Sequence, residues 1–149
     1  MKRSILILLL CLLSPLSVVL AASDPNDTTG SADPDLFSRM PGFHIQEFES
    51  QEFGRHEFPT GPGTVEKVEG RKTVVSYYAN EGITLPSGLQ ITRNYVGAAQ
   101  SVGGAEVYAF EDGGYEYSTI RVTSADKDVW VLVYGANNGM YNVEMVERQ

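Results

Sequence analysis

The chain of 149 residues carries 11 basic and 19 acidic side chains, a formal net charge of −8, and a single cysteine. An acidic protein repels phosphate backbones and anionic lipids, so binding to nucleic acid and electrostatic binding to membranes are not expected, and solubility is the simplest explanation of the charge. One cysteine forms no disulfide within the chain, so the fold must depend on a hydrophobic core.

The first residues have the pattern of a secretory signal peptide. Two basic residues precede the apolar stretch 5–13, and the small pair Ala21-Ala22 follows at a position suited to cleavage. Pro15 interrupts the apolar run before it reaches the roughly 20 residues of a membrane span. We therefore expect residues 1–21 to be a signal peptide, cleaved after Ala21 or Ala22. The mature chain would then be exported, would have no transmembrane segment, and would carry 9 basic against 19 acidic residues.

The segment after the signal peptide contains no large apolar residue. Residues 22–35 are built from Asp, Pro, Ser, Thr, Asn, Ala and Gly, which predicts a flexible leader. Its carboxylates lack the spacing of an EF-hand loop, so a calcium site is not expected. The remaining residues, 36–149, have the length of a single domain.

The Glu-Phe pair recurs three times near the start of this domain, as Glu47-Phe48, Glu52-Phe53 and Glu57-Phe58. An odd spacing would place successive phenylalanines on opposite faces of a straight strand, but Gly54 allows a bulge or bend that restores them to one face. The repeat thus predicts a bent edge strand with most phenylalanines buried and the glutamates in water. The rival interpretation, a metal site that includes His44 or His56, is not favoured because the ligand spacing is missing.

Most of the domain has the composition and alternation of antiparallel strands. Three strand pairs are expected around turn signals: 65–68 and 73–79 around Gly70, 105–111 and 115–123 around residues 112–114, and 129–134 and 141–146 around Asn138-Gly139. The unbroken apolar run 129–134 indicates a strand covered on both faces, with Trp130 expected to pack under a helix. The alternative is that this run is an interface for a partner strand.

Residues 87–102 break the period of two and predict one amphipathic helix. At about 100° per residue the polar positions gather in one stripe, and the other positions, from Leu89 to Val102, are mostly apolar. The stripe consists of Gln90, Arg93, Asn94, Gly97, Gln100 and Ser101. Because so wide an apolar face needs a sheet to cover it, we expect an α+β fold: an antiparallel, mostly meandering β-sheet with this helix packed on it.

The sequence lacks the motifs of known catalytic sites. No G-x-S-x-G, Walker or G-x-G-x-x-G motif occurs, the mature chain would have no cysteine, and its only histidines are His44 and His56. We therefore expect neither an enzyme nor a bound cofactor or metal.

Two pairs of residues are candidate binding residues. Tyr115 and Tyr117, beside a turn, are expected to be exposed and able to stack on sugars or peptides, although such tyrosines are also common packing residues of strands. Arg93 and Asn94, on the polar stripe of the helix, are expected to contact a partner. The alternative for Arg93 is a local ion pair.

Four stretches resemble the amino-terminal module of uncharacterised bacterial periplasmic OmpA-family proteins, a domain of unknown function. They are LFSRMPGFHIQEFESQEFGRHEFPTGPG, KVEGRKTVVSYYANEG, PSGLQITRNYVGAAQSVGGAEVY and DVWVLVYGANNGMYNVEMVER. The matching positions are Ser38, Arg39, Pro41, Gly42, Gly70, Arg93, Asn94, Tyr95, Gly104 and Glu144. The resemblance implies an envelope protein in the periplasm of a Gram-negative bacterium. Fuller relatives carry a carboxy-terminal domain that binds peptidoglycan, and because the resemblance does not extend to that domain, peptidoglycan anchoring is not carried over.

Two functions are consistent with these observations. The first is an exported, non-enzymatic binding or scaffold module whose partner is an envelope protein or peptidoglycan. The alternative is a small secreted hydrolase or glycan-binding protein that uses Glu, His and Tyr side chains in a cleft. A concave pocket with converging side chains would favour the alternative. The sequence contains no signal of the oligomeric state.

Overall fold

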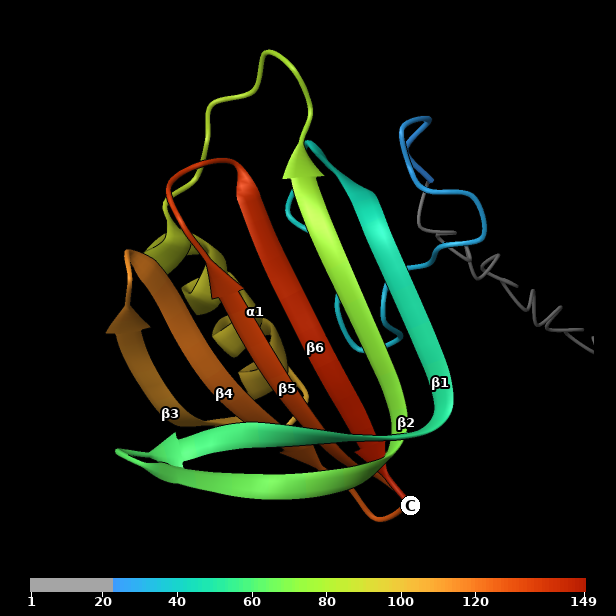
Figure 1. Ribbon diagram of the computed structural model, residues 1–149, viewed down its shortest axis with the longest axis vertical. Helices are drawn as coiled ribbons and strands as arrows, with labels where there is room; N and C mark the ends of the chain where they lie inside the picture. Colours follow the sequence, from blue (N-terminus) through green and yellow to red (C-terminus); the bar gives the residue numbers. More distant parts are fainter. Residues whose placement is uncertain (1–22) are drawn as a thin grey trace, which may run out of the picture.

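The computed structural model describes residues 23–149, and the expected signal peptide, residues 1–21, lies outside this range. Within it, six antiparallel strands form one sheet in the order β1-β2-β6-β5-β4-β3, and a single helix lies across one face (Figure 1). The strands are β1 (Phe43–Gly61), β2 (Thr64–Ala79), β3 (Ala105–Asp112), β4 (Tyr115–Thr123), β5 (Asp128–Gly135) and β6 (Met140–Arg148), and the helix is α1 (Gly88–Ser101). The protein is therefore mostly antiparallel β-sheet with one helix, a description more accurate than α+β.

The connections between neighbouring strands confirm most of the expected meander. The turn between β3 and β4 contains Gly113 and Gly114, and the turn between β5 and β6 contains Gly139, all three with positive φ. The exception is β6, which pairs with β2 as well as with β5, so that Val75 lies opposite Val143. The apolar strand β5 lies inside the sheet between β4 and β6, and is not available to a partner strand.

The helix is formed as the sequence predicts. The side chain of Ser87 caps its amino terminus by accepting a hydrogen bond of 3.1 Å from the backbone N–H of Gln90. All six residues of the polar stripe are exposed. The opposite face packs on the sheet and forms the main core, in which Ile91, Tyr95 and Ala99 are almost fully buried. Leu89 and Val102, at the two ends of the apolar face, are instead about half exposed.

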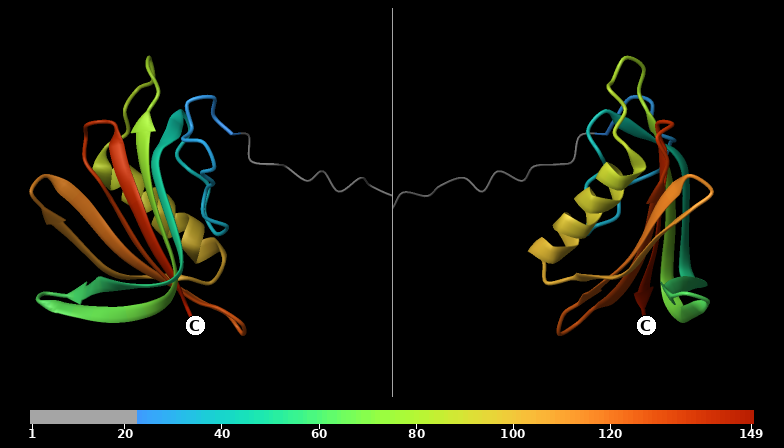
Figure 2. Two further views of the ribbon diagram at one scale, coloured as in Figure 1. Left: turned by 45° about the vertical axis from the view of Figure 1, so that its right-hand side comes forward. Right: turned by 90° about the vertical axis from the view of Figure 1, so that its left-hand side faces the viewer.

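The β1–β2 hairpin is much longer than the others and bends across the sheet. Gly54 and Gly70 lie opposite each other at the bend. Beyond them, residues 55–69, which we call the arm, cross the face of the sheet opposite α1 (Figure 2). The arm buries Phe58 and Val68 against the sheet residues Trp130, Leu132 and Val146, and we call these five residues the arm core.

The structure corrects the expected turn around Gly70. Strand β2 runs through this residue without interruption, and the hairpin turn lies at Pro62 and Gly63 instead. Glycine is required at position 70 for a different reason: an added Cβ would lie 1.9 Å from the backbone oxygen of Glu147 in β6. Local composition indicates a turn at Gly70. The residue is instead part of a strand, and the close approach of β6 explains why it is a glycine.

Trp130 does not pack under the helix as expected. Side chains alternate along β5, so Val129, Val131 and Val133 face α1 while Trp130 and Leu132 face the arm. The expected covering of β5 on both faces is confirmed, but two different elements provide it. The three phenylalanines of the Glu-Phe repeat also have different environments. Phe48 packs against the main core, Phe58 lies in the arm core, and Phe53 at the bend is 63 % exposed.

Within the expected leader, residues 22–35, several residues make specific contacts with the rest of the chain. The Arg39 guanidinium lies 2.5 Å from the Asp27 carboxylate and 2.9 Å from that of Asp33. The hydroxyl of Tyr77 donates a hydrogen bond of 2.8 Å to Asp33. The backbone N–H of Thr28 donates to the carbonyl of Ile45 at the outer edge of β1, at 2.9 Å. These polar residues are ordered by partners elsewhere in the chain, which composition does not reveal.

We predict opposite effects on stability for two glycine-to-alanine substitutions. Gly70→Ala should lower the free energy of unfolding by about 3 kcal/mol, because the new methyl group collides with the backbone of β6. Gly97→Ala should raise it by about 0.8 kcal/mol, because this helix position has open space around it. Urea denaturation followed by circular dichroism measures both. Similar stability of the two variants would contradict the proposed role of the bend.

Candidate functional site

Aromatic side chains form a continuous row on the arm side of β3, β4 and β5. The register places Phe110 opposite Tyr117, and Tyr117 opposite Tyr134. Their rings stack with centroid distances of 4.5 Å and 5.1 Å. Tyr108 stacks on Phe110 at 5.4 Å, and Tyr115 meets Tyr134 edge to face at 6.4 Å. We call these five residues the aromatic row, and all of them are half-buried.

The stacking decides which parts of the rings a ligand can reach. Phe110 and Tyr117 are almost parallel, with an angle of 4° between their planes, and Tyr117 and Tyr134 differ by 18°. Each ring face in the middle of the row therefore contacts another ring. The row presents ring edges and hydroxyl groups to solvent, so it offers little free face on which a sugar ring could stack.

A small apolar hollow lies at the β3 end of the row. Pro59, Pro62 and Val65 of the arm and its tip face Tyr108 and Phe110 across a space of about 260 Å³. Val65 is 47 % exposed there. We call this space the edge hollow. It is smaller than the pockets that hold drug-sized ligands and suits one or two apolar side chains.

Under the arm, three polar side chains connect the two layers. His56 Nδ1 lies 3.0 Å from Glu144 Oε2, and the hydroxyl of Tyr134 donates a hydrogen bond of 3.2 Å to Glu144 Oε1. The hydrogen bond from His56 is the main reason why the pKa of Glu144 is lowered, and burial opposes this effect. Burial, assisted by the charge of Glu144, raises the pKa of Tyr134 to about 12. These groups fix the arm to β5 and β6.

The imidazole–carboxylate pair has only part of the arrangement that nucleophilic catalysis needs. A catalytic histidine uses one ring nitrogen to bind the carboxylate and the other to activate a hydroxyl or thiol. His56 Nε2 is buried and has no hydrogen-bond partner among residues 23–149. The pair connects the arm to the sheet through His56 Nδ1 and Glu144 Oε2.

The structure places one pair of the predicted binding residues in the aromatic row and the other pair away from it. Tyr115 and Tyr117 both belong to the aromatic row, with their ring centroids 6.3 Å apart. Arg93 and Asn94 lie on the exposed stripe of α1, on the other side of the sheet. Arg93 Nη1 is 3.3 Å from Glu106 Oε2, which is the local ion pair considered as its alternative.

The sequence analysis does not identify several members of the site, although the sequence contains a signal for two of them. Tyr108 and Phe110 have the same period-two spacing as Tyr115 and Tyr117, and a tight turn lies between the two pairs. That pattern could have placed all four rings on one face of a hairpin. The contribution of Tyr134 depends on the pairing of β4 with β5, and the contact of His56 with Glu144 depends on the bend.

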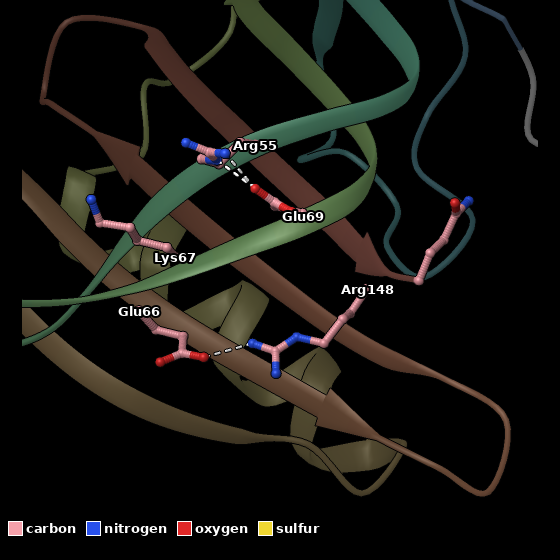
Figure 3. A pocket seen from close by; sticks show the side chains of 6 residues that line it. Arg55, Glu66, Lys67, Glu69 and Arg148 are labelled. Atoms are coloured by element: carbon pink, nitrogen blue, oxygen red, sulfur yellow. Dashed lines mark hydrogen bonds and ion pairs between the residues drawn. The ribbon is translucent and has the colours of Figure 1, made fainter.

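A wider hollow, of about 470 Å³, lies between the arm and the carboxyl end of β6 (Figure 3). Its charged side chains bind one another: Arg55 lies 2.5 Å from Glu69, and Arg148 lies 2.6 Å from Glu66. Because these charges are already paired at an open surface, the hollow has no evident attraction for a charged ligand.

No family model matches this chain, and no curated protein has a matching sequence. Within residues 23–149, no helix is long and apolar enough to cross a membrane. The same part of the chain contains no group of three His, Cys, Asp or Glu side chains that could hold a metal ion.

We predict that the contact between the arm and the sheet weakens in acid. The pKa of Glu144 is lowered by folding, so its contribution to stability is present above its ordinary value of 4.5 and is lost as the pH falls through the folded value. At neutral pH, Glu144→Gln should lower the free energy of unfolding by about 1 kcal/mol. The difference from the wild type should shrink as the pH falls below 4.5.

Urea denaturation at a series of pH values measures this difference. Glu57→Gln is the matched control, because Glu57 also has a lowered pKa but pairs with Lys67 at 2.8 Å on the outer surface of the arm. Its effect should be smaller, since solvent screens an exposed pair. An equal effect of the two substitutions would show that the buried contact has no special importance.

Proposed function

We propose that the protein is an exported, non-enzymatic binding module of the envelope of a Gram-negative bacterium, and that it holds an envelope protein through the aromatic row and the edge hollow. The observation that carries this proposal is the joining of five half-buried aromatic rings to an apolar hollow on one face. Tyrosine is enriched at protein interfaces because it supplies a large contact area and a hydroxyl group. The signal-like amino terminus and the resemblance to periplasmic OmpA-family modules support the location.

The lining of the edge hollow favours binding over catalysis. It contains no carboxylate, imidazole or amine. His56 and Glu144 are held together beneath the arm, and the hydroxyl that accompanies them, that of Tyr134, has a raised pKa and is therefore not activated as a nucleophile. General acid–base or nucleophilic chemistry needs such groups within reach of a substrate. A secreted hydrolase is therefore less well supported than a binding module.

The stacking of the rings also favours a protein partner over a glycan. Binding a sugar by stacking requires an open aromatic face, whereas the middle rings of the row cover each other. Ring edges, hydroxyl groups and an apolar hollow suit the side chains and backbone of a polypeptide.

Photo-crosslinking in cells tests this surface. We predict that a photoreactive phenylalanine analogue in place of Tyr115 captures an envelope protein. The same analogue in place of Tyr78, a half-buried tyrosine of β2 outside the row, should capture none. A third position, Asn94 on the exposed stripe of α1, tests the helix face in the same way. Capture from position 94 alone would contradict the proposed surface.

Co-sedimentation with purified sacculi distinguishes a glycan from a protein partner. We predict no retention of the purified protein on sacculi at physiological salt. Retention that persists in salt and disappears in Tyr115→Ala would identify peptidoglycan as the ligand of the aromatic row and overturn the choice of a protein partner.

A further inference from the structure

Strand β3 is an open edge of the sheet. In the part of the chain that the structure describes, β3 pairs with β4 alone. The opposite edge is partly covered, because Thr28 donates to the carbonyl of Ile45 and the carboxylate of Asp27 accepts a hydrogen bond of 2.7 Å from the Ile45 N–H. Unpaired backbone N–H and C=O groups on an edge are a template for an additional strand.

We infer that β3 binds an extended segment of the partner as an added strand, and that this segment alternates apolar and basic residues. The inference rests on the proposed function and specifies the chemistry of the partner. The register irregularity between Glu106 and Tyr108 disrupts the first part of the edge. The usable edge is therefore residues 108–112, a length typical of a short strand.

The edge hollow explains why alternate residues of the segment should be apolar. An added strand would lie about 4.8 Å from β3, and every second side chain would point to the arm side. There it would meet Tyr108 and Phe110, with Pro59 and Val65 facing them across the hollow. The small volume of the hollow, about 260 Å³, matches aliphatic side chains.

The other face of β3 explains why the intervening residues should be basic. Glu111 lies directly opposite Glu116 on β4, and neither carboxylate has an ion-pair partner within residues 23–149. Like charges directly opposite each other on a sheet are unfavourable, and a cation next to them would relieve the repulsion. Lys or Arg in the added strand would point to this face, because successive side chains alternate.

The same charges argue against a second copy of this chain as the occupant. Pairing β3 with β3 of another copy would bring together two sets of the carboxylates of Glu111 and Glu116, in chains that each carry a formal charge of −8. A basic segment of a different protein satisfies both faces of the edge.

A fluorescent synthetic peptide of about six residues that alternates Val and Lys is the direct probe. We predict saturable binding to the purified protein by fluorescence anisotropy, and slower amide hydrogen exchange in residues 108–112 when the peptide is present. The same peptide with N-methyl groups on alternate amides keeps its side chains and charge but cannot pair as a strand. Equal binding of the methylated peptide would overturn the inference.

Substitutions in the protein separate the two faces. Val65→Asp should weaken peptide binding by about tenfold or more because it places a charge in the hollow, and Glu111→Lys should weaken it to a similar extent by repelling the basic residues. Val102→Asp is the matched control, since Val102 is a similarly exposed valine at the end of α1 and should leave binding unchanged. Equally weakened peptide binding in all three variants would contradict the assignment, and so would unchanged binding in all three.

Failure of this inference is distinguishable from failure of the proposed function. If the peptide does not bind but position 115 still captures an envelope protein, strand addition at β3 is wrong and the aromatic row remains the binding surface. If neither result is obtained, both proposals fall.

Discussion

The close approach of β2 to β6 at Gly70 is the constraint on which the rest of the structure depends. The absence of a side chain there lets the β1–β2 hairpin bend beside the backbone of Glu147 and turn back across the sheet (Figure 1). The bend places Phe58 over Trp130 and sets the tip of the arm beside β3. A straight hairpin would leave the arm-side face of β5 uncovered and would form no edge hollow.

The two faces of the sheet consequently differ in kind. The face under α1 is a filled core whose buried tyrosines bind one another, with the hydroxyls of Tyr95 and Tyr141 3.2 Å apart. The face under the arm is only partly covered, and its aromatic side chains extend from the arm core to the open edge at β3. The contact between His56 and Glu144 and the ion pair between Glu66 and Arg148 both lie where the arm meets β6, so polar contacts help to hold the cover of the arm core and one wall of the hollow.

Local pattern predicted the features that local physics controls. The polar stripe of α1 and the glycine turns after β3 and β5 depend on neighbouring residues, and all of them are present. The errors concern residues whose environment comes from far along the chain. Gly70 faces the backbone of β6. The carboxylate of Asp33 binds the Arg39 guanidinium and accepts a hydrogen bond from the hydroxyl of Tyr77.

Local pattern indicates only part of the candidate site. Tyr108, Phe110, Tyr115 and Tyr117 share a period-two spacing on the two sides of one turn, but the stacking of Tyr117 on Tyr134 depends on the register between β4 and β5. Trp130 packs under the arm and not under α1, because an unbroken apolar run does not show which element covers which side. The arm reaches Trp130 only because the β1–β2 hairpin bends at Gly54 and Gly70.

The position of β6 has a consequence for the order in which the molecule assembles. This strand follows all the others along the chain, yet it lies between β2 and β5 in the sheet. The β1–β2 hairpin and the β3–β4–β5 meander are local units that β6 alone joins into one sheet. Contacts between distant segments form slowly because the intervening loop must first be closed. A chain that emerges from its amino terminus would therefore hold two incomplete sheets, and assembly of the native state would wait for residues 140–148.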